Sequence, residues 1–417
     1  MEEDRKEWKE RRTTMNVKER LLNYVTIYTG SKEEQDTTPS TKEQFHLAHL
    51  LEKEMKEIGL SDVSVDEHSY VYGFLPATQG CESCKHIGFI AHLDIVNDFG
   101  SKEINPQVIE NYDGGEIKLG NSDCILNVEQ FPELQNAIGK TLITTDGKTV
   151  LGADDKAGIA EILTMCEILI SENIPHGKIC ICFTPDEEIG HGAALLDLEY
   201  FDADYGYTVD GSAPNEIEYE TFNAASAVFD ILGVSVHPGD AKDKMVNASL
   251  VAMEIDGLLP KGETPTDTED REGFYHLCNM QGNVGKAKLS YIVRDHDRIN
   301  FEKRKQRLME IEKTVNDKYG LGTVKLKLQD QYKNMAEIIK RHPEVLEKAE
   351  EAIKKSGLQP VSNPVRGGTD GAQLSFRGLP CPNLGTGGYA MHGPYEHVII
   401  EEMEQVVQIL LNIVQKE

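Results

Sequence analysis

Three short hydrophobic runs constrain the fold of this 417-residue chain more than any other feature. They are IGFIAHLD (87–94), KICICFT (178–184) and YGYTVDG (205–211), and a helical pattern from Lys156 to Ser171 separates the first two. Buried strands that alternate with helices are typical of an α/β sheet covered on both faces. The amphipathic stretch from Ile400 to Val414 is expected to pack as the last helix.

Two further packing helices are predicted before the first of these runs. One begins near Asn16, where apolar residues follow at helical spacing. In the other, Ser40 is the expected N-cap, Glu43 occupies the third helical position, and Gly59 follows the last turn.

The middle of the chain has a different pattern. Its predicted elements are a strand (228–236), a helix (243–258), two strands (274–281 and 286–293), a helix (297–318) and a strand (323–331). The order β-α-β-β-α-β is the ferredoxin-like arrangement, an independent two-layer unit. We therefore predict an α/β domain of residues 15–221 and 333–417, an inserted α+β domain at 222–332, and a solvated extension at 1–14.

The charge of the chain excludes several classes of partner. Asp and Glu number 71 against 43 Lys and Arg, which gives a net charge of -28. Nucleic acids and anionic membrane surfaces are bound through clustered Lys and Arg, so neither is an expected partner, whereas divalent cations are compatible. The N-terminus lacks the apolar segment of a signal peptide, and no apolar run approaches the ~18–20 residues of a membrane span.

The eight cysteines are scattered, which fits a reducing cytoplasm better than a disulfide framework. Cys81 and Cys84 have the spacing of a zinc or redox pair, but a structural zinc site needs a second ligand pair. Cys180 and Cys182 alternate along a predicted strand instead. We therefore place Cys81 and Cys84 in a variable loop.

Five segments place metal-ligand residue types at strand ends or in glycine-rich turns. These segments are His92-x-Asp94, the turn with Asp154-Asp155, Pro185-Asp186-Glu187-Glu188, Val209-Asp210-Gly211, and Gly385-Thr386-Gly387 followed by His392 and Glu396. Each alone has an ordinary interpretation, such as a structural histidine, a helix N-cap, a surface pair or a turn. Because ligands bind at the carboxyl ends of strands in open α/β sheets, together they predict a co-catalytic metal site.

Other catalytic motifs are absent from the sequence. Gly139-Lys140-Thr141 has Leu134 where a P-loop needs glycine, and GTGG at 385–388 lacks the spacing of a dinucleotide fingerprint. Neither a G-x-S-x-G elbow nor an H-E-x-x-H zinc motif occurs.

Seven segments resemble, in order and spacing, those of the co-catalytic zinc exopeptidase family, which includes carnosinases, aminoacylases and desuccinylases. They are GFIAHLD, TLITTDGKTVLGADDKAGIAEI, FTPDEEIGHGA, TVDG, VHPGDAK, RGGTDGAQLS and GTGGYAMHGPYE. The resemblance extends from about Met15 to the C-terminus, and INPQVIENYDGGEIKLG (104–120) indicates the tripeptidase branch. It implies a zinc-exopeptidase-like catalytic domain with the inserted ferredoxin-like domain as a lid. Departures are the extension, the loop at 76–86, and Asp155 at a position that is often Asn.

The resemblance also implies a set of metal ligands. Asp154 would bridge two metal ions, one also bound by His92 and Asp210, the other by Glu188 and His392. The expected cofactors are two Zn²⁺ ions, with Co²⁺ or Mn²⁺ as alternatives. A water between the metals would lose its proton and attack the first peptide carbonyl.

Three residues receive supporting catalytic roles from the resemblance. Glu187 would be the general base, and Asp94 would hold the imidazole of His92. His237, expected at the end of the first strand of the lid, would donate to the oxyanion. The alternative for His237 is a turn residue before Pro238.

Substrate binding is assigned to the lid. Arg294 and Asn247 resemble residues that hold the peptide backbone and carboxylate, and Arg suits bidentate carboxylate recognition. Arg366 is a weaker candidate, with a loop arginine paired to Asp370 as the alternative.

Together with the resemblance, these observations predict a cytoplasmic tripeptide aminopeptidase that acts on small peptides; a homodimer through the lid is compatible with the sequence, which leaves the oligomeric state open. A dipeptidase or an N-acyl-amino-acid hydrolase of the same fold is the first alternative. A binding or scaffold protein with a vestigial metal site is the second.

Overall fold

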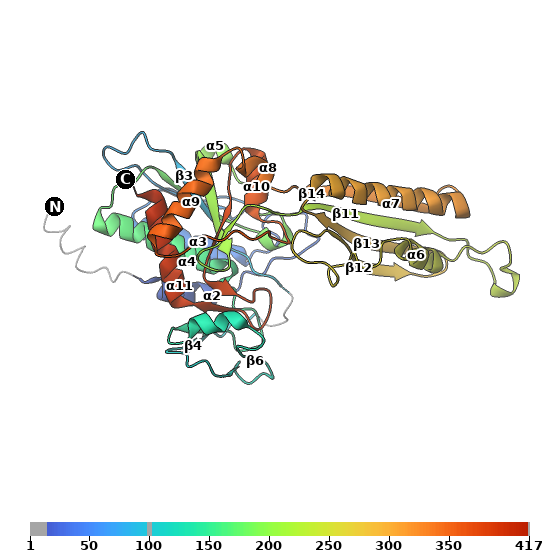
Figure 1. Ribbon diagram of the computed structural model, residues 1–417, viewed down its shortest axis with the longest axis horizontal. Coiled ribbons are helices and arrows are strands. Elements are labelled where there is room, and N and C mark those ends of the chain that lie inside the picture. Colours follow the sequence, from blue (N-terminus) through green and yellow to red (C-terminus); the bar gives the residue numbers. More distant parts are fainter. Residues whose placement is uncertain (1–14, 98–101, 416–417) are drawn as a thin grey trace. The chain divides into compact units, whose positions relative to one another are not determined.

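The computed structural model of the chain describes residues 15–97 and 102–415, which divide into two compact units (Figure 1). The first unit contains the described residues up to 218 together with 338–363 and 369–415, and the second contains 219–337 and 364–368. The predicted boundaries lie a few residues from these, but the return of 364–368 to the second unit was not predicted. The predicted extension at 1–14 lies outside the described residues. No helix among the described residues has the length and apolarity needed to cross a membrane.

A seven-stranded mixed sheet forms the centre of the first unit. Its order is β1 (Ser61–Val65), β2 (Val71–Leu75), β8 (Ile179–Thr184), β3 (Ile87–His92), β9 (Tyr205–Gly211), β15 (Asn383–Gly385) and β10 (Ile217–Glu218). The four strands β8, β3, β9 and β15 are parallel, so their carboxyl ends share one edge of the sheet. Every residue of β3 and β8 is buried, as expected for strands covered on both faces.

Helices cover both faces of this sheet. One face shares a hydrophobic core with α2 (Val17–Val25), α3 (Gln44–Ile58), α4 (Ala153–Glu172), α9 (Pro343–Lys355) and α11 (Ile400–Val414) (Figure 1). The opposite face packs against α5 (Leu198–Phe201) and α10 (Asp370–Arg377). The predicted covered α/β sheet is confirmed, and the C-terminal helix has the predicted ends.

The start of α3 differs from the prediction. The helix begins at Gln44, its N-cap residue is Glu43, and no side chain caps it. The Ser40 hydroxyl instead donates to the Asp186 carboxylate at 2.6 Å, and the Ser40 N–H donates to the same carboxylate at 2.7 Å. The predicted Ser40 cap is therefore wrong, because Asp186 is distant in sequence and takes this hydroxyl. Gly59 ends the helix with φ 110°, as predicted.

A smaller sheet lies within the first unit and was not predicted. Its order is β16 (Gly388–Tyr389), β17 (His397–Ile399), β7 (Leu142–Thr144) and β4 (Gln107–Ile109). A two-stranded sheet of β5 (Ile117–Lys118) and β6 (Ile125–Leu126), and the 3₁₀ turn η1 (Pro132–Ala137), lie near it in sequence. Pairing of β7 with β17 joins the 104–150 region to the segment that carries His392.

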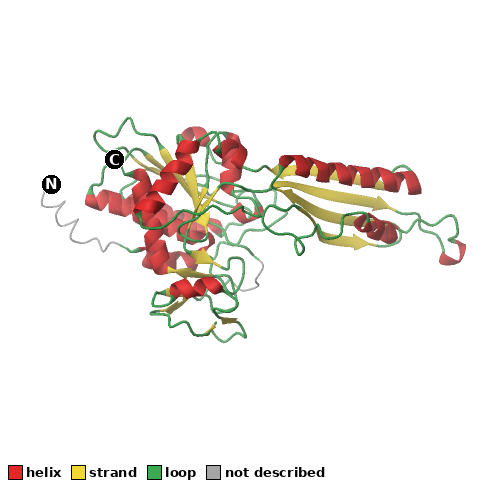
Figure 2. Cartoon of the chain, in the orientation of Figure 1, coloured by secondary structure: helices red, strands yellow, loops and turns green. Residues whose placement is uncertain are grey.

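The second unit has the predicted β-α-β-β-α-β order. Its antiparallel sheet has the order β12 (Phe274–Gly282), β13 (Lys286–Asp295), β11 (Asn223–Leu232) and β14 (Val324–Tyr332). One face packs against α6 (Ala248–Gly257) and α7 (Arg298–Tyr319), and Figure 2 shows α7 alongside the strands. This is the ferredoxin-like arrangement.

The first strand of the second unit ends earlier than predicted. β11 ends at Leu232, and a Cβ at Gly233 would lie 2.2 Å from the Val284 carbonyl oxygen and 2.4 Å from that of Val246. The chain leaves the sheet at this close approach, which only glycine permits. His237 therefore lies beyond the strand, in the 3₁₀ turn η3 (Pro238–Asp240) as its N-cap, and not at the strand end.

Candidate metal centre

The carboxyl edge of the central sheet gathers acidic residues and histidines. His92 is the last residue of β3, and Asp210 lies near the end of the neighbouring strand β9. Glu188 lies in the 3₁₀ turn η2 (Glu187–Ile189), directly after the strand β8 on the other side of β3. Asp154 lies in the first turn of α4, with non-helical φ -79° and ψ 102°. Local structure therefore directs these residues to one edge.

The side chain of Asp154 joins two histidines from distant parts of the chain. Its Oδ1 lies 2.9 Å from His92 Nε2, and its Oδ2 lies 3.0 Å from His392 Nε2. His392 Nε2 also lies 3.0 Å from Glu188 Oε2, and His92 Nε2 lies 3.5 Å from Asp210 Oδ1. The structure thus brings together all five residues predicted as metal ligands.

This donor set suits divalent metals. Ligand atoms of His92, Asp154 and Glu188 all lie within 4.8 Å of one another. Imidazole nitrogen and carboxylate oxygen are common ligands of Zn²⁺ and of other divalent transition metals. Asp155 also lies near His92 and Asp210, but its carboxylate accepts main-chain N–H groups of His92 and Gly158, each at 3.2 Å.

Protonation of the cluster follows from its burial and charge. Hydrogen bonds to Asp154 and Glu188 raise the pKa of His392 to about 11. Burial alone would raise the pKa of Asp154, but His392 and His92 lower it well below its ordinary value. Burial, followed by the charge of Asp154, raises the pKa of Glu188 to about 7. Protons on the imidazoles therefore compensate the carboxylates, and a metal ion would compete with those protons.

Asp94 contacts both sides of the cluster, but differently from the prediction. Its main-chain oxygen lies 3.0 Å from His92 Nδ1, whereas its carboxylate is 3.5 Å from that atom. The carboxylate accepts the N–H groups of Glu187 at 2.9 Å and Glu188 at 3.3 Å. Asp94 thus orients the His92 ring through its backbone and the Glu187–Glu188 turn through its side chain.

Glu396 is a buried residue whose role the sequence did not indicate. One carboxylate oxygen accepts the N–H groups of Leu151 at 2.6 Å and Gly152 at 2.9 Å, and the other accepts that of Asp154 at 3.0 Å. Because Glu396 follows His392 by four residues, it connects the loops that carry two of the clustered side chains. The only sequence signal was an acidic residue close to His392.

Comparison with known proteins agrees with the geometry of this cluster. Residues 146–416 match peptidase family M20/M25/M40. The chain is 52% identical to Peptidase T of Clostridium perfringens (strain 13 / Type A), over 95% of this chain and 98% of that protein. The chain belongs to peptidase family M20/M25/M40. As a member of this family it is a peptidase, and within the family it groups with proteins named Peptidase T.

Solved structures of an aminopeptidase and a tripeptidase share the fold. The crystal structure of aminopeptidase PepT from Bacillus cereus has a TM-score of 0.74 at 25% identity, covering 96% of this chain and 98% of its own. A tripeptidase from Staphylococcus aureus has a TM-score of 0.73 at 22% identity, with the same coverage of both chains. The predicted fold class, a zinc-exopeptidase-like domain with an inserted α+β domain, is confirmed.

His237 and Asn247, two of the residues predicted to act on substrate in this M20 member, make local bonds in the second unit. His237 Nδ1 accepts the N–H of Gly239 at 3.1 Å. Asn247 is the N-cap of α6, and its side chain accepts the N–H of Ser249 at 3.0 Å. The first contact stabilises the turn η3 and the second caps α6, and neither contact tests the predicted role in substrate binding.

The two predicted substrate arginines also bond within the second unit. Arg294 is buried and donates to the carbonyl oxygens of Ala225 at 3.2 Å and Val293 at 3.0 Å. Arg366 donates to the carbonyl oxygens of Asp270 and Glu272, each at 3.0 Å. These bonds differ from the alternative in which Arg366 pairs with Asp370.

Asp370 itself makes a bond within the first unit. Its carboxylate accepts the Thr184 hydroxyl at 2.8 Å. Its second oxygen is buried and has no partner among the described residues. Burial is the main cause that raises the pKa of Asp370 to about 7.

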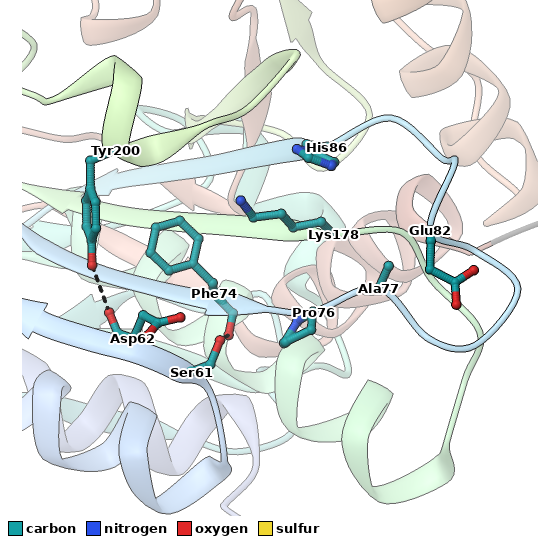
Figure 3. A pocket seen from close by; sticks show the side chains of 9 residues that line it. All are labelled: Ser61, Asp62, Phe74, Pro76, Ala77, Glu82, His86, Lys178 and Tyr200. Atoms are coloured by element: carbon teal, nitrogen blue, oxygen red, sulfur yellow. Dashed lines mark hydrogen bonds between the residues drawn. The ribbon is translucent and has the colours of Figure 1, made fainter.

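A surface cavity of about 380 Å³ lies away from the metal cluster, at the amino ends of β3 and β8 (Figure 3). It is lined by Ser61, Asp62, Phe74, Pro76, Ala77, Glu82, His86, Lys178 and Tyr200. Lys178 pairs with Asp202 at 2.7 Å and lies 5.0 Å from the centre of the Phe74 ring. Since His86 and Lys178 precede the strands whose other ends carry His92 and Glu188, this cavity is separate from the metal cluster.

Proposed function

We propose that the protein is a dinuclear metal aminopeptidase that releases the N-terminal residue from tripeptides. The observation that carries the proposal is the position of Asp154, whose two oxygens lie 2.9 Å and 3.0 Å from the Nε2 atoms of two different histidines. A carboxylate shared in this way is suited to hold two cations at the short separation of a co-catalytic site.

The contacts of the cluster support one assignment of ligands. Asp154 would bridge the two metals, His92 and Asp210 would complete one site, and Glu188 and His392 would complete the other. We propose Zn²⁺ in both sites, with Co²⁺ or Mn²⁺ as alternatives. When bound, such ions act as Lewis acids and lower the pKa of bound water toward ~7, which supplies a nucleophile near neutral pH.

Glu187 is the proposed general base. It is adjacent to Glu188 in η2, and Asp94 fixes its main chain through the 2.9 Å bond. Burial, followed by the charge of Asp210, raises the pKa of Glu187 well above its ordinary value, which favours uptake of a proton. Glu187 would accept the proton of the attacking water and return it to the leaving amine.

The substrate assignment has weaker support than the metal ligands. It depends on the resemblance to the tripeptidase branch and on the names of relatives, an aminopeptidase PepT and a tripeptidase among them. The roles of His237, Asn247, Arg294 and Arg366 in substrate binding, and the homodimer through the second unit, stay predictions. The cytoplasmic location is likewise a proposal, supported by eight cysteines that are all unpaired.

A metal-reconstitution assay tests the proposal. The full chain is stripped with a chelator, reloaded with Zn²⁺, Co²⁺ or Mn²⁺, and assayed on di-, tri- and tetrapeptides and on N-acyl amino acids. We expect two metals per chain and hydrolysis of tripeptides at their first bond. Faster cleavage of N-acyl amino acids than of tripeptides would overturn the substrate assignment. Full activity of the metal-free protein would overturn the proposal that the metal centre is needed for hydrolysis.

Glu187→Gln tests the general base separately. We expect it to keep both metals and lose about 10²–10⁴-fold in kcat, the usual contribution of a positioned general base. Glu129→Gln, at an exposed position, is the matched control and should leave kcat unchanged. Unchanged kcat in Glu187→Gln would remove Glu187 from the mechanism.

A further inference from the structure

Cys81 and Cys84 have no role in the proposed peptidase mechanism. They lie in the 76–86 loop, which connects β2 to β3. Cys81 is 2% exposed, Cys84 is partly exposed, and both are free thiols. The pair is therefore available for chemistry of its own.

The backbone of the loop holds the two cysteines in one turn. The Cys84 N–H donates to the Cys81 carbonyl oxygen at 3.0 Å, so Cys81 and Cys84 are the first and fourth residues of a β-turn. The α-carbons of such a turn lie within about 7 Å of each other. A disulfide spans α-carbons about 4.4–6.8 Å apart, so the α-carbon spacing of this turn is compatible with a disulfide.

The turn is anchored to the body of the first unit. The Cys81 N–H donates to Thr78 at 2.9 Å, and the Thr78 N–H donates to His176 at 3.0 Å. Cys84 packs against Gly177, where an added Cβ would lie 2.8 Å from the Cys84 Cβ. Because the loop is held at both cysteines, closing a disulfide needs little additional ordering.

A metal site is a poorer interpretation of the pair. Among residues 15–97 and 102–415, the groups of three side chains placed to hold a metal all contain His92, and none contains Cys81 or Cys84. His86, the nearest histidine in sequence, has its Nδ1 at 3.0 Å from the Asp202 carbonyl oxygen. Two thiols without further ligands do not form a structural zinc site.

We propose that Cys81 and Cys84 form a thiol–disulfide exchange site that reacts with low-molecular-weight disulfides of the glutathione type. The Cys84 thiolate attacks one sulfur of the small disulfide, which releases one small thiol and leaves a mixed disulfide on Cys84. The Cys81 thiolate then attacks the Cys84 sulfur and releases the second small thiol. One small disulfide is reduced to two thiols, and the protein dithiol is oxidised to one disulfide.

A surface cavity borders the loop beside the two cysteines and is lined by neither of them. Glu82, between the two cysteines, and His86, after them, both line the cavity of about 380 Å³ (Figure 3). Cys84 is the expected point of attack because it is more exposed than Cys81. Cys81 then acts as the resolving thiol.

The test uses the full-length, metal-loaded protein with oxidised glutathione as the probe. Cys278→Ser serves as the background, since Cys278 is exposed and would form an unrelated adduct. After digestion without reductant, we expect the peptide with both cysteines to lose about 2 Da, the mass of the two thiol hydrogens. Excess dithiothreitol should restore the original mass.

Single variants in the same background distinguish the two cysteines. Cys81→Ser should accumulate a stable glutathione adduct on Cys84, and Cys84→Ser should leave Cys81 unmodified. Peptidase activity should stay equal in all variants, because neither cysteine belongs to the metal cluster. A persistent adduct on Cys84 of the intact pair, or two free thiols after oxidation, would overturn the proposal.

Discussion

Residues singled out in the first unit contact one another, whereas those singled out in the second unit contact their own backbone. The Nε2 atoms of His92 and His392 lie 2.9 Å and 3.0 Å from the two oxygens of Asp154. In contrast, Asn247 caps a helix and Arg294 donates to two carbonyl oxygens. Mutual contact between distant residues of metal-ligand type is a stronger sign of a site than a residue type alone, since local bonds explain the second group.

The two units also differ in charge. The second unit contains 19 Asp and Glu against 18 Lys and Arg, so nearly all of the net charge of -28 belongs to the rest of the chain. The first unit therefore carries the carboxylate excess along with the cluster. This distribution fits cation binding in the first unit and electrically balanced surfaces in the second.

The largest expected effect comes from breaking the shared contact of the cluster. Asp154→Ala should lose both metals and reduce kcat about 10³-fold or more, because the two ions would face each other without a common carboxylate. Metal content and tripeptide hydrolysis are measured on the purified variant. Asp123→Ala, at an exposed position, is the control. Two bound metals in Asp154→Ala would contradict the bridging role.

Glu396 gives the next largest effect, since it connects the Asp154 and His392 loops. In Glu396→Gln, an amide group replaces an oxygen that accepts main-chain N–H groups, so metal affinity should fall about 10–100-fold, as for other residues that orient ligands. Competition with a metal-binding dye measures the affinity. Glu404→Gln, exposed on α11, should match the parent protein. If the two variants had equal metal affinities, Glu396 would contribute to folding and not to metal binding.

A substitution of Arg294 tests whether a residue of the second unit acts on substrate in addition to its bonds to the backbone. If Arg294 holds the substrate carboxylate as predicted, Arg294→Lys should raise KM for tripeptides about tenfold, with kcat nearly unchanged, because bidentate contact is lost in ground and transition states alike. Metal content should remain at two per chain. Arg298→Lys, at an exposed position, is the matched control. Unchanged KM would leave Arg294 with only its structural bonds.

The last prediction concerns stability alone and Glu161, a buried carboxylate of α4 that belongs to neither group. No described residue bonds either of its carboxylate oxygens. Burial raises its pKa well above the ordinary value. Between the ordinary pKa of Glu161 in the unfolded chain and its raised pKa in the folded protein, the folded protein keeps a proton that the unfolded chain releases. The free energy of unfolding therefore falls as pH rises, by up to about 1.4 kcal/mol per pH unit.

Glu161→Gln should remove this dependence. We expect its free energy of unfolding to exceed that of the parent by a margin that grows from pH 5 to pH 8, measured by urea denaturation at each pH. Glu172→Gln, at an exposed position in the last turn of the same helix, is the control. Parallel pH profiles of Glu161→Gln and the parent would show that Glu161 has a partner in solution.

Local patterns in the sequence were sufficient for most of the fold. Hydrophobic periodicity predicted β3, β8, β9, the order of elements in the second unit, and the ends of α11. Burial of one or both faces of a helix or strand requires apolar residues at regular spacing along that segment, so the pattern can be seen in consecutive residues. The smaller sheet was missed, because its strands have only two or three residues and β7 pairs with β17 across more than 250 residues of sequence.

The sequence by itself determined which side chains could bind metal, since each lies at the end of a recognisable strand or turn. Only the tertiary structure decided how they are held. The Asp186 carboxylate accepts the Ser40 hydroxyl that was predicted to cap α3. The main-chain oxygen of Asp94 contacts the His92 ring, and the Glu396 carboxylate accepts the N–H of Asp154. The Ser40 and Glu396 contacts join residues 146 and 242 positions apart, so they emerge only when the strands and loops are packed together. The Asp94 contact is local, but the same packing directs the Asp94 carboxylate to the N–H groups of Glu187 and Glu188 and leaves its main-chain oxygen for His92.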